Sequence, residues 1–187
     1  MKFYNGEPED SKIIDIIFKW IVDIVIVLVL ALFVYMYCCQ QTKVQGNSMN
    51  DMLKNEDQVL VNTIAYNILP VARYDVISFH KAMEDGEKIQ YVKRVIGLPG
   101  DTILIKDGEF YVNGKKLDYK KSKDKIVNAG LATEEIKLKD DEYFVIGDNI
   151  NNSEDSRSAT VGNVKKTEID GKVWLISWPF ANINLVK

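Results

Sequence analysis

The chain has 187 residues, enough for one folded domain and an appendage. Its net charge of -3 lacks the basic footprint typical of nucleic-acid-binding proteins, so we expect no nucleic-acid partner. One histidine, His80, and two adjacent cysteines, Cys38 and Cys39, are too few for a Cys/His zinc site or a disulfide framework. We therefore expect neither a metal nor a cofactor.

The first predicted element is a transmembrane helix over residues 20–39. Residues 24–39, IVIVLVLALFVYMYCC, carry no charge and would cover about 24 Å of the roughly 30 Å hydrocarbon layer as a helix. Extension back to Trp20 supplies the rest. A buried core helix is the alternative, but little else in the chain is helical enough to surround it. No small-x-small pattern follows the run, so we expect a retained anchor after a short cytoplasmic or interfacial segment, residues 1–19.

The remaining residues, 40–187, predict one domain of mainly β structure. Short runs rich in Val, Ile, Tyr and Phe alternate with turns, without the rhythm of alternating strands and helices. Two Asx-Gly dipeptides, at 107–108 and 113–114, suit type I′ turns and predict hairpin-like antiparallel sheet over residues 102–117. Residues 118–139 are polar and lysine-rich, and we expect a surface insertion there.

Ser48, in the stretch GNSMNDML, is a candidate nucleophile that needs a base to take its proton. His80 is one candidate base, but no aspartate is evident to orient it, and an exposed histidine at a strand end is the simpler interpretation. Lys93 is the other, in QYVKRVIGLPGD. Lys93 and Arg94 point to opposite faces of a strand, so one of them should face inward. Burial that lowers a lysine pKa from about 10.4 to about 7 costs roughly 4–5 kcal/mol, and a neutral lysine can serve as a general base. An ordinary edge-strand lysine is the alternative.

Three motifs follow one another in the order found in type I signal peptidases. They are Ser48-Met49, YVKRVIGLPGD at 91–101 and GDNINNSEDSRS at 147–158. Over nearly its whole length the chain resembles the short, single-span bacterial members of that family. The resemblance implies a signal-peptidase-like antiparallel β domain on the extracytoplasmic face of a bacterial plasma membrane. It also implies a serine–lysine dyad endopeptidase that removes signal peptides from exported preproteins after a small-x-small site, with Ser48 as nucleophile and Lys93 as general base.

The same resemblance assigns supporting roles to other residues. It implies that Ser153 positions the lysine amine, that Asp155 and Arg157 form an ion pair near the site, and that a turn shapes the site. The turn comprises Gly147, Asp148 and Asn149. The residues expected to contact substrate are Gly46, Met49 and Tyr91. Gly46 stands where some relatives have a serine that adds a hydroxyl to the oxyanion hole, so the hole would use the N–H of Ser48. A common turn, a structural ion pair and core packing of Tyr91 are the structural alternatives.

The motifs also depart from the family pattern. Asp51 stands for proline, Met52 for threonine, and Ile150 and Asn151 for the usual arginine and aspartate. A carboxylate at residue 51 near Lys93 would raise the lysine pKa and weaken the base. Two other hypotheses therefore stay open beside a peptidase acting on preproteins at the lipid bilayer. One is a non-cleaving assembly factor for surface proteins such as pilins. The other, a self-cleaving regulator, is disfavoured by the membrane span and the lack of a DNA-binding domain.

Overall fold

The computed structural model describes residues 9–50, 52–82, 86–119 and 125–186, and the chain divides into two units, residues 1–37 and 38–187. Helix α1 (Glu9–Cys38) forms nearly all of the described first unit. Its stretch Ile13–Cys38 has 26 residues and contains an 18-residue window with a mean hydropathy of 2.8, and its large apolar side chains are exposed. Asp15, Lys19 and Asp23 lie in its first part, and from Ile24 onward the helix is apolar on all sides. A helix of this length and hydropathy fits a membrane anchor. The helix begins at Glu9, ahead of the predicted span 20–39.

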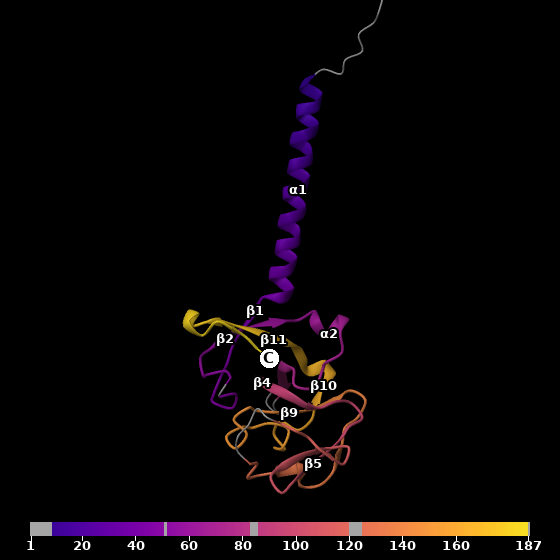
Figure 1. Cartoon of the computed structure of the whole chain (residues 1–187), viewed down its shortest axis with the longest axis vertical. Coiled ribbons are helices and arrows are strands. Elements are labelled where there is room, and N and C mark those ends of the chain that lie inside the picture. The colour runs from indigo at the N-terminus through magenta and orange to yellow at the C-terminus, as the bar shows by residue number, and fades with distance from the viewer. Residues whose placement is uncertain (1–8, 51, 83–85, 120–124, 187) are drawn as a thin grey trace, which may run out of the picture. The chain divides into compact units, whose positions relative to one another are not determined.

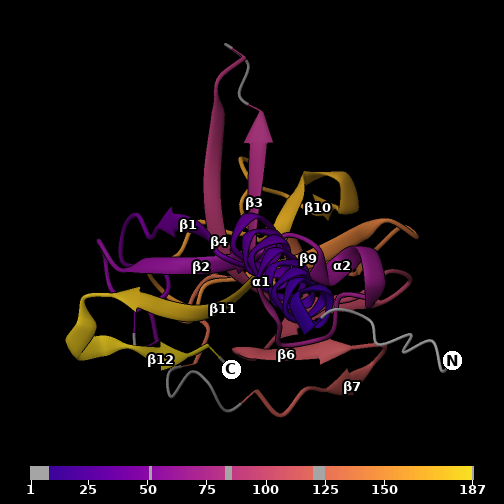
Figure 2. The ribbon, with the colours of Figure 1, turned by 90° about the horizontal axis from the view of Figure 1, so that it is seen from above.

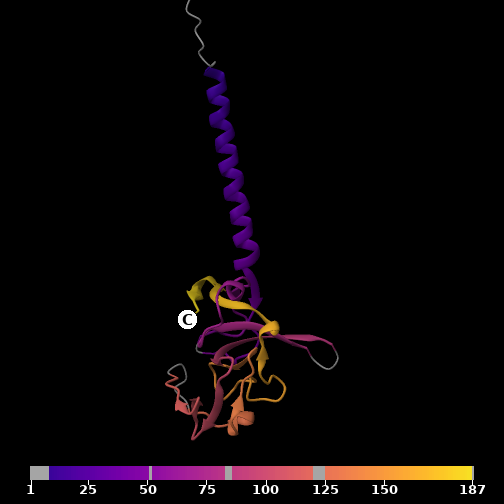
Figure 3. The same ribbon diagram turned by 90° about the vertical axis from the view of Figure 1, so that its right-hand side faces the viewer.

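The second unit consists of two antiparallel sheets (Figure 1), which confirms the mainly β prediction. The strands of the larger sheet, in spatial order, are β1 (Gln40–Lys43), β2 (Gln58–Asn62), β11 (Ile169–Trp178), β3 (Val76–Ala82), β4 (Lys88–Gly97), β9 (Glu142–Ile146) and β10 (Val164–Lys165), with β12 (Asn184–Leu185) paired to β11. The smaller sheet runs β7 (Lys115–Lys116), β6 (Glu109–Val112), β5 (Thr102–Lys106) and β8 (Ile136–Lys137). Short helical turns complete the unit: α2 (Ala65–Ile68), η1 (Gly130–Thr133), η2 (Lys166–Glu168) and η3 (Phe180–Asn182). Figures 1 and 3 show the smaller sheet at the opposite end of this unit from β1 and β2.

The smaller sheet confirms the predicted hairpins. Asp107 and Gly108 have φ angles of 55° and 78°, and Asn113 and Gly114 have φ angles of 53° and 74°. Positive φ at both central residues is what a type I′ turn requires, and it matches the right-handed twist of the paired strands. The turn chemistry read from the two dipeptides therefore sets the register of β5, β6 and β7.

The segment 118–139 is more than the surface insertion that we expected. Residues 120–124 lie outside the described part, but β8 pairs with β5, and Ala132 and Leu138 are 0% and 2% exposed. Both side chains belong to the core cluster beneath the smaller sheet. We expected a surface segment because it is rich in lysine and its apolar residues are isolated. These residues are buried because β8 pairs with β5.

Strand β4 carries the second motif and lies inside the larger sheet. It pairs with β3 from Lys88 to Arg94, whereas β9 pairs only with its last part, from Arg94 onward. On the side away from β3, no other strand of the described chain pairs with residues 88–93. Figure 2 shows β3 and β4 running out together beyond their neighbours. Lys93 and Arg94 point to opposite faces, and both are buried, at 4% and 0% exposure.

Candidate active site

Ser48 lies in the turn that joins β1 to β2. The carbonyl of Met49 accepts hydrogen bonds from the N–H groups of Met52 and Leu53 at 3.2 and 2.8 Å, which closes a helical turn behind the serine. Met49 and Leu53 are both 0% exposed and pack in one core cluster. The structure therefore places Met49 in the core, and its side chain anchors the half-buried Ser48 from below. Asp51 lies outside the described residues, so its effect on the lysine stays a hypothesis.

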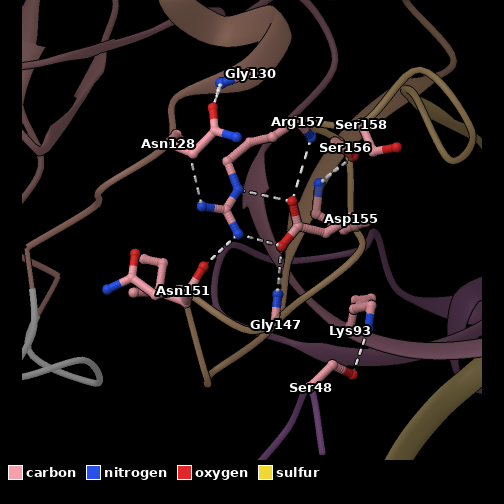
Figure 4. Close-up of polar contacts among 12 residues, drawn as sticks. Ser48, Lys93, Asn128, Gly130, Gly147, Asn151, Asp155, Ser156, Arg157 and Ser158 are labelled. Atoms are coloured by element: carbon pink, nitrogen blue, oxygen red, sulfur yellow. Dashed lines mark hydrogen bonds and ion pairs between the residues drawn. The ribbon is translucent and has the colours of Figure 1, made fainter. Parts of the chain in front are cut away.

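The Nζ of Lys93 is hydrogen-bonded to the Oγ of Ser48 (Figure 4). The two residues are 45 positions apart in the chain, and the strand pairing of β4 brings them together. Burial lowers the pKa of Lys93 to about 8 because the ammonium loses its hydration. The carboxylates of Asp155 and Glu154 act in the opposite direction, and the Arg157 guanidinium adds to the lowering. A substantial fraction of this lysine is thus neutral in mildly alkaline solution.

The Gly147–Asn149 turn holds the backbone of the serine loop. The N–H of Asn149 donates to the carbonyl of Ser48 at 3.0 Å, and its side-chain amide donates to the carbonyl of Asn47 at 3.0 Å. A Cβ on Gly147 would lie 2.3 Å from the Ser48 carbonyl oxygen, so only glycine allows this close approach. Through these contacts the turn holds the backbone at residues 47 and 48, next to the proposed nucleophile.

Asp155 and Arg157 form a buried, two-pronged ion pair behind that turn. Arg157 Nε and Nη2 each donate to one oxygen of the Asp155 carboxylate at 2.8 Å, and the carboxylate is 0% exposed. The same carboxylate accepts the N–H of Gly147 at 3.1 Å. Arg157 also donates to the carbonyls of Asn128 and Ile150. In Figure 4, Gly147 lies between this pair and the Ser48–Lys93 contact, so the ion pair holds the turn in place.

Asp148 belongs to a second buried network, which the sequence analysis missed. Its carboxylate accepts two hydrogen bonds from Arg94 at 2.7 Å and one from the hydroxyl of Tyr119 at 3.0 Å. Arg94 also donates to the carbonyl of Tyr74 at 2.7 Å and lies 3.0 Å from the sulfur of Met52. Because neighbouring residues of a strand point to opposite faces, the pair Lys93-Arg94 could have predicted that Arg94 is buried. No feature of the sequence pointed to a role for Tyr119.

Ser153 does not make the contact that the resemblance implied. Its Oγ is buried and has no hydrogen-bond partner among the described residues, and the Lys93 amine is hydrogen-bonded to Ser48. A Cβ on Gly147 would lie 2.3 Å from this Oγ. Ser153 thus packs beside the glycine turn, and its positioning role stays a prediction.

A cleft of about 340 Å³ opens at the dyad. Its walls comprise residues 42–48, residues 89–93, Asn152 and Glu154. Gly46 and Tyr91 line it as predicted, and the Tyr91 ring centre lies 5.9 Å from the Lys93 Nζ. Gly46 has a φ of 79°, a conformation that favours glycine. As a glycine it offers no hydroxyl to the cleft. Within the described ranges, no group of three or more His, Cys, Asp or Glu side chains is placed to hold a metal ion.

His80 has an aspartate partner, contrary to our expectation. Its Nδ1 lies 2.8 Å from an oxygen of Asp170, which is the extra residue at a bulge where β11 pairs with β3. A bulge re-aims side chains, and no local sequence pattern indicates one at Asp170. On β3, His80 is three residues from Ile77, the partner of Lys93, or about 10 Å along the strand. The histidine therefore does not compete with Lys93 for Ser48.

Comparison with known proteins agrees with this geometry. The family model described as signal peptidase, peptidase S26, matches residues 17–178. Signal peptidase I of Bacillus caldolyticus is 38% identical over 172 residues, covering 86% of this chain and 89% of that protein. Signal peptidase I S of Bacillus subtilis (strain 168) is 36% identical over 172 residues, covering 88% and 90%. Signal peptidase IB of Staphylococcus aureus (strain COL) is 33% identical over 180 residues, covering 88% and 91%. The chain therefore belongs to the type I signal peptidases of peptidase family S26, the enzymes that remove signal peptides from preproteins.

Proposed function

We propose that Ser48 is the nucleophile and Lys93 the general base of this signal peptidase. The observation that carries the proposal is the hydrogen bond between Lys93 Nζ and Ser48 Oγ, with the lysine 4% exposed and its pKa lowered to about 8 by burial. A serine is a weak nucleophile until a base takes its proton, and a buried lysine meets that requirement without histidine. The two residues line the same cleft.

The chemistry follows from the two protonation states of Lys93. The neutral amine takes the proton of Ser48 Oγ while that oxygen attacks the carbonyl carbon of the scissile bond. The resulting ammonium gives its proton to the leaving amine, which becomes the new N-terminus of the mature protein. Lys93 then takes a proton from water, whose oxygen attacks the ester carbonyl. Lys93 returns that proton to Ser48 Oγ as the acyl–oxygen bond breaks, which restores the free serine and the neutral amine. The N–H of Ser48 stabilises the oxyanion, and Gly46 contributes no side-chain donor.

The open edge of β4 supports our expectation of cleavage after small-x-small sequences. Residues 88–93 of β4 have one edge without a strand partner among the described residues, so an extended peptide can add there as a strand. In an extended peptide, residues i and i+2 face the same side. Two small side chains separated by one residue would therefore face the same wall of the cleft. We propose that cleavage follows such a site.

We further propose that α1 anchors the enzyme in a bacterial plasma membrane, with the β domain on the extracytoplasmic face. The length and hydropathy of Ile13–Cys38 support the anchor. Lysines flank the span on both sides, so their number does not decide the orientation. The extracytoplasmic orientation follows from the substrate, because exported preproteins present their cleavage sites where they leave the membrane.

The test is cleavage by the full-length protein in detergent or lipid vesicles. An exported preprotein and a pilin precursor serve as substrates, and Ser48→Ala is compared with wild type after near-ultraviolet circular dichroism has shown both to be folded. We expect cutting at a small-x-small site that is lost in Ser48→Ala. Normal processing by the variant would refute the nucleophile assignment. Failure of folded wild type to cut either substrate would instead support the non-cleaving assembly factor.

A further inference from the structure

One acidic residue on the cleft wall takes no part in the dyad chemistry. Glu154 lies between Ser153 and Asp155, lines the cleft that contains Ser48 and Lys93, and is exposed. Its neighbour Asp155 is 0% exposed and carries a two-pronged ion pair to Arg157. Two adjacent carboxylates on one loop are thus treated differently: one is neutralised inside the protein and the other is left on the substrate side.

The negative charge of Glu154 is not compensated by the described residues. Glu154 forms no ion pair with any of them, and Lys43, the other charged residue on the cleft wall besides Lys93, is paired with Glu56. Lys93 itself must be neutral when it acts as a base. Before Lys93 takes the proton of Ser48, Glu154 is therefore the one charged residue on the described cleft wall that has no ion-pair partner.

The carboxylate lies near enough to the dyad for its charge to act there. The pKa of Tyr91 is raised by burial and then by Glu154, and Glu154 also opposes the burial that lowers the pKa of Lys93. Tyr91 and Lys93 line the same cleft as Ser48, beside which the scissile bond must lie. A charged substrate side chain beside that bond would experience the same field.

We propose that Glu154 selects substrates by charge: it favours preproteins that carry lysine or arginine beside the small-x-small residues, and it disfavours those that carry aspartate or glutamate there. The inference rests on the proposed function, because it takes this cleft as the substrate site. It adds a property that the dyad alone does not supply, since neither Ser48 nor a neutral Lys93 carries a charge that could attract or repel a substrate side chain.

The expected effect is modest because Glu154 is exposed. A single solvent-exposed charge pair typically changes an equilibrium by no more than about fivefold, and replacing lysine by glutamate in the substrate exchanges attraction for repulsion. We expect a lysine-over-glutamate ratio of kcat/KM of about three- to tenfold. The ratio should fall toward one in 1 M salt, where the Debye length is about 3 Å.

The experiment uses full-length protein in detergent and one preprotein in matched pairs. Each pair carries lysine or glutamate at a single position flanking the cleavage site, outside the two small residues, and positions are tested in turn on both sides. The ratio within a pair is measured for wild type, Glu154→Gln and Glu154→Lys. We expect a ratio of three or more at one position at least in wild type, a ratio near one in Glu154→Gln and an inverted ratio in Glu154→Lys.

Glu134→Gln is the matched control, because Glu134 is an exposed glutamate that does not line the cleft. It should keep the wild-type ratio. A wild-type ratio near one at every position, or an unchanged ratio in Glu154→Gln, would overturn the inference. Ser48→Ala is assayed on the same pairs: cleavage by that variant would refute the proposed nucleophile, whereas its inactivity together with an unchanged Glu154→Gln ratio would refute the charge selection alone.

Discussion

Replacing Lys93 with methionine should make the β domain more stable at neutral pH, although Lys93 is the proposed general base. Methionine has a similar length and no charge, so it can occupy the buried site without desolvating an ammonium. Sites that are built for chemistry often carry such a stability penalty. The stability of Lys93→Met therefore tests whether the folded protein disfavours the ammonium form of Lys93.

The magnitude follows from the pKa of Lys93. Burial lowers it from 10.5 to about 8, which corresponds to about 3 kcal/mol of unfavourable burial of the charged form. Between those two pH values the unfolded chain holds the proton and the folded protein does not, so stability rises with pH through this window. Below pH 8 the full penalty is present. Loss of the hydrogen bond to Ser48 offsets about 1 kcal/mol, which leaves a net gain of about 2 kcal/mol for Lys93→Met at pH 6.

The assay is urea unfolding of the full-length protein in detergent at pH 6 and pH 11, followed by tryptophan fluorescence from Trp174 and Trp178 in β11. At pH 11 the gain should vanish or become a small loss, because Lys93 is then neutral in both states. Lys88→Met is the control, since Lys88 lies exposed on the same strand and should give a small effect at both pH values. A Lys93→Met protein that is less stable at pH 6, or a difference that does not change with pH, would refute the reasoning.

Three further substitutions probe the surroundings of the dyad. Gly147→Ala should lower the rate of preprotein cleavage by about 100-fold or more, because its Cβ would lie 2.3 Å from the Ser48 carbonyl oxygen and must displace the serine loop; near-normal turnover would contradict this. Arg157→Ala should lower the free energy of unfolding in urea by about 3–5 kcal/mol, because it leaves the buried Asp155 carboxylate without its counter-charge; a loss below 1 kcal/mol would show that the pair is not needed. His80→Gln should keep cleavage within about threefold of wild type, since His80 is bonded to an aspartate and not to the nucleophile; a 100-fold loss would restore a histidine-based mechanism.

Local signals in the sequence were enough for the hairpins and for the faces of β4. The Asp107-Gly108 and Asn113-Gly114 turns depend on φ preferences of the residues themselves, so no tertiary contact is needed to predict them. The alternation of Lys93 and Arg94 likewise follows from strand geometry alone. We expected only one of the two to face inward, and both are buried because each face of β4 is covered at that point. The contact between Lys93 and Ser48 could not be predicted from strand geometry, and we expected it only because the motifs follow the order found in the family.

Long-range contacts account for what the sequence did not reveal. The pairing of His80 with Asp170 joins residues 90 positions apart and depends on a bulge in β11 that no local pattern announces. The hydroxyl of Tyr119 reaches Asp148 from a segment whose composition is that of a surface loop. Leu138 is buried by β8 pairing with β5, although lysines precede and follow it. In each case the contact is made with a segment distant in the sequence, which the segment's own residues do not specify.

The most direct test of the dyad is the pH dependence of kcat/KM for preprotein cleavage, with wild type measured beside Lys93→Met from pH 6 to pH 10. Because the base must be neutral and its pKa is about 8, wild-type kcat/KM should rise about tenfold per pH unit below pH 8 and level off above it. Lys93→Met should show no cleavage at any pH. A wild-type profile that is flat from pH 6 to pH 9, or cleavage by folded Lys93→Met, would contradict the assignment of Lys93 as the base that activates Ser48.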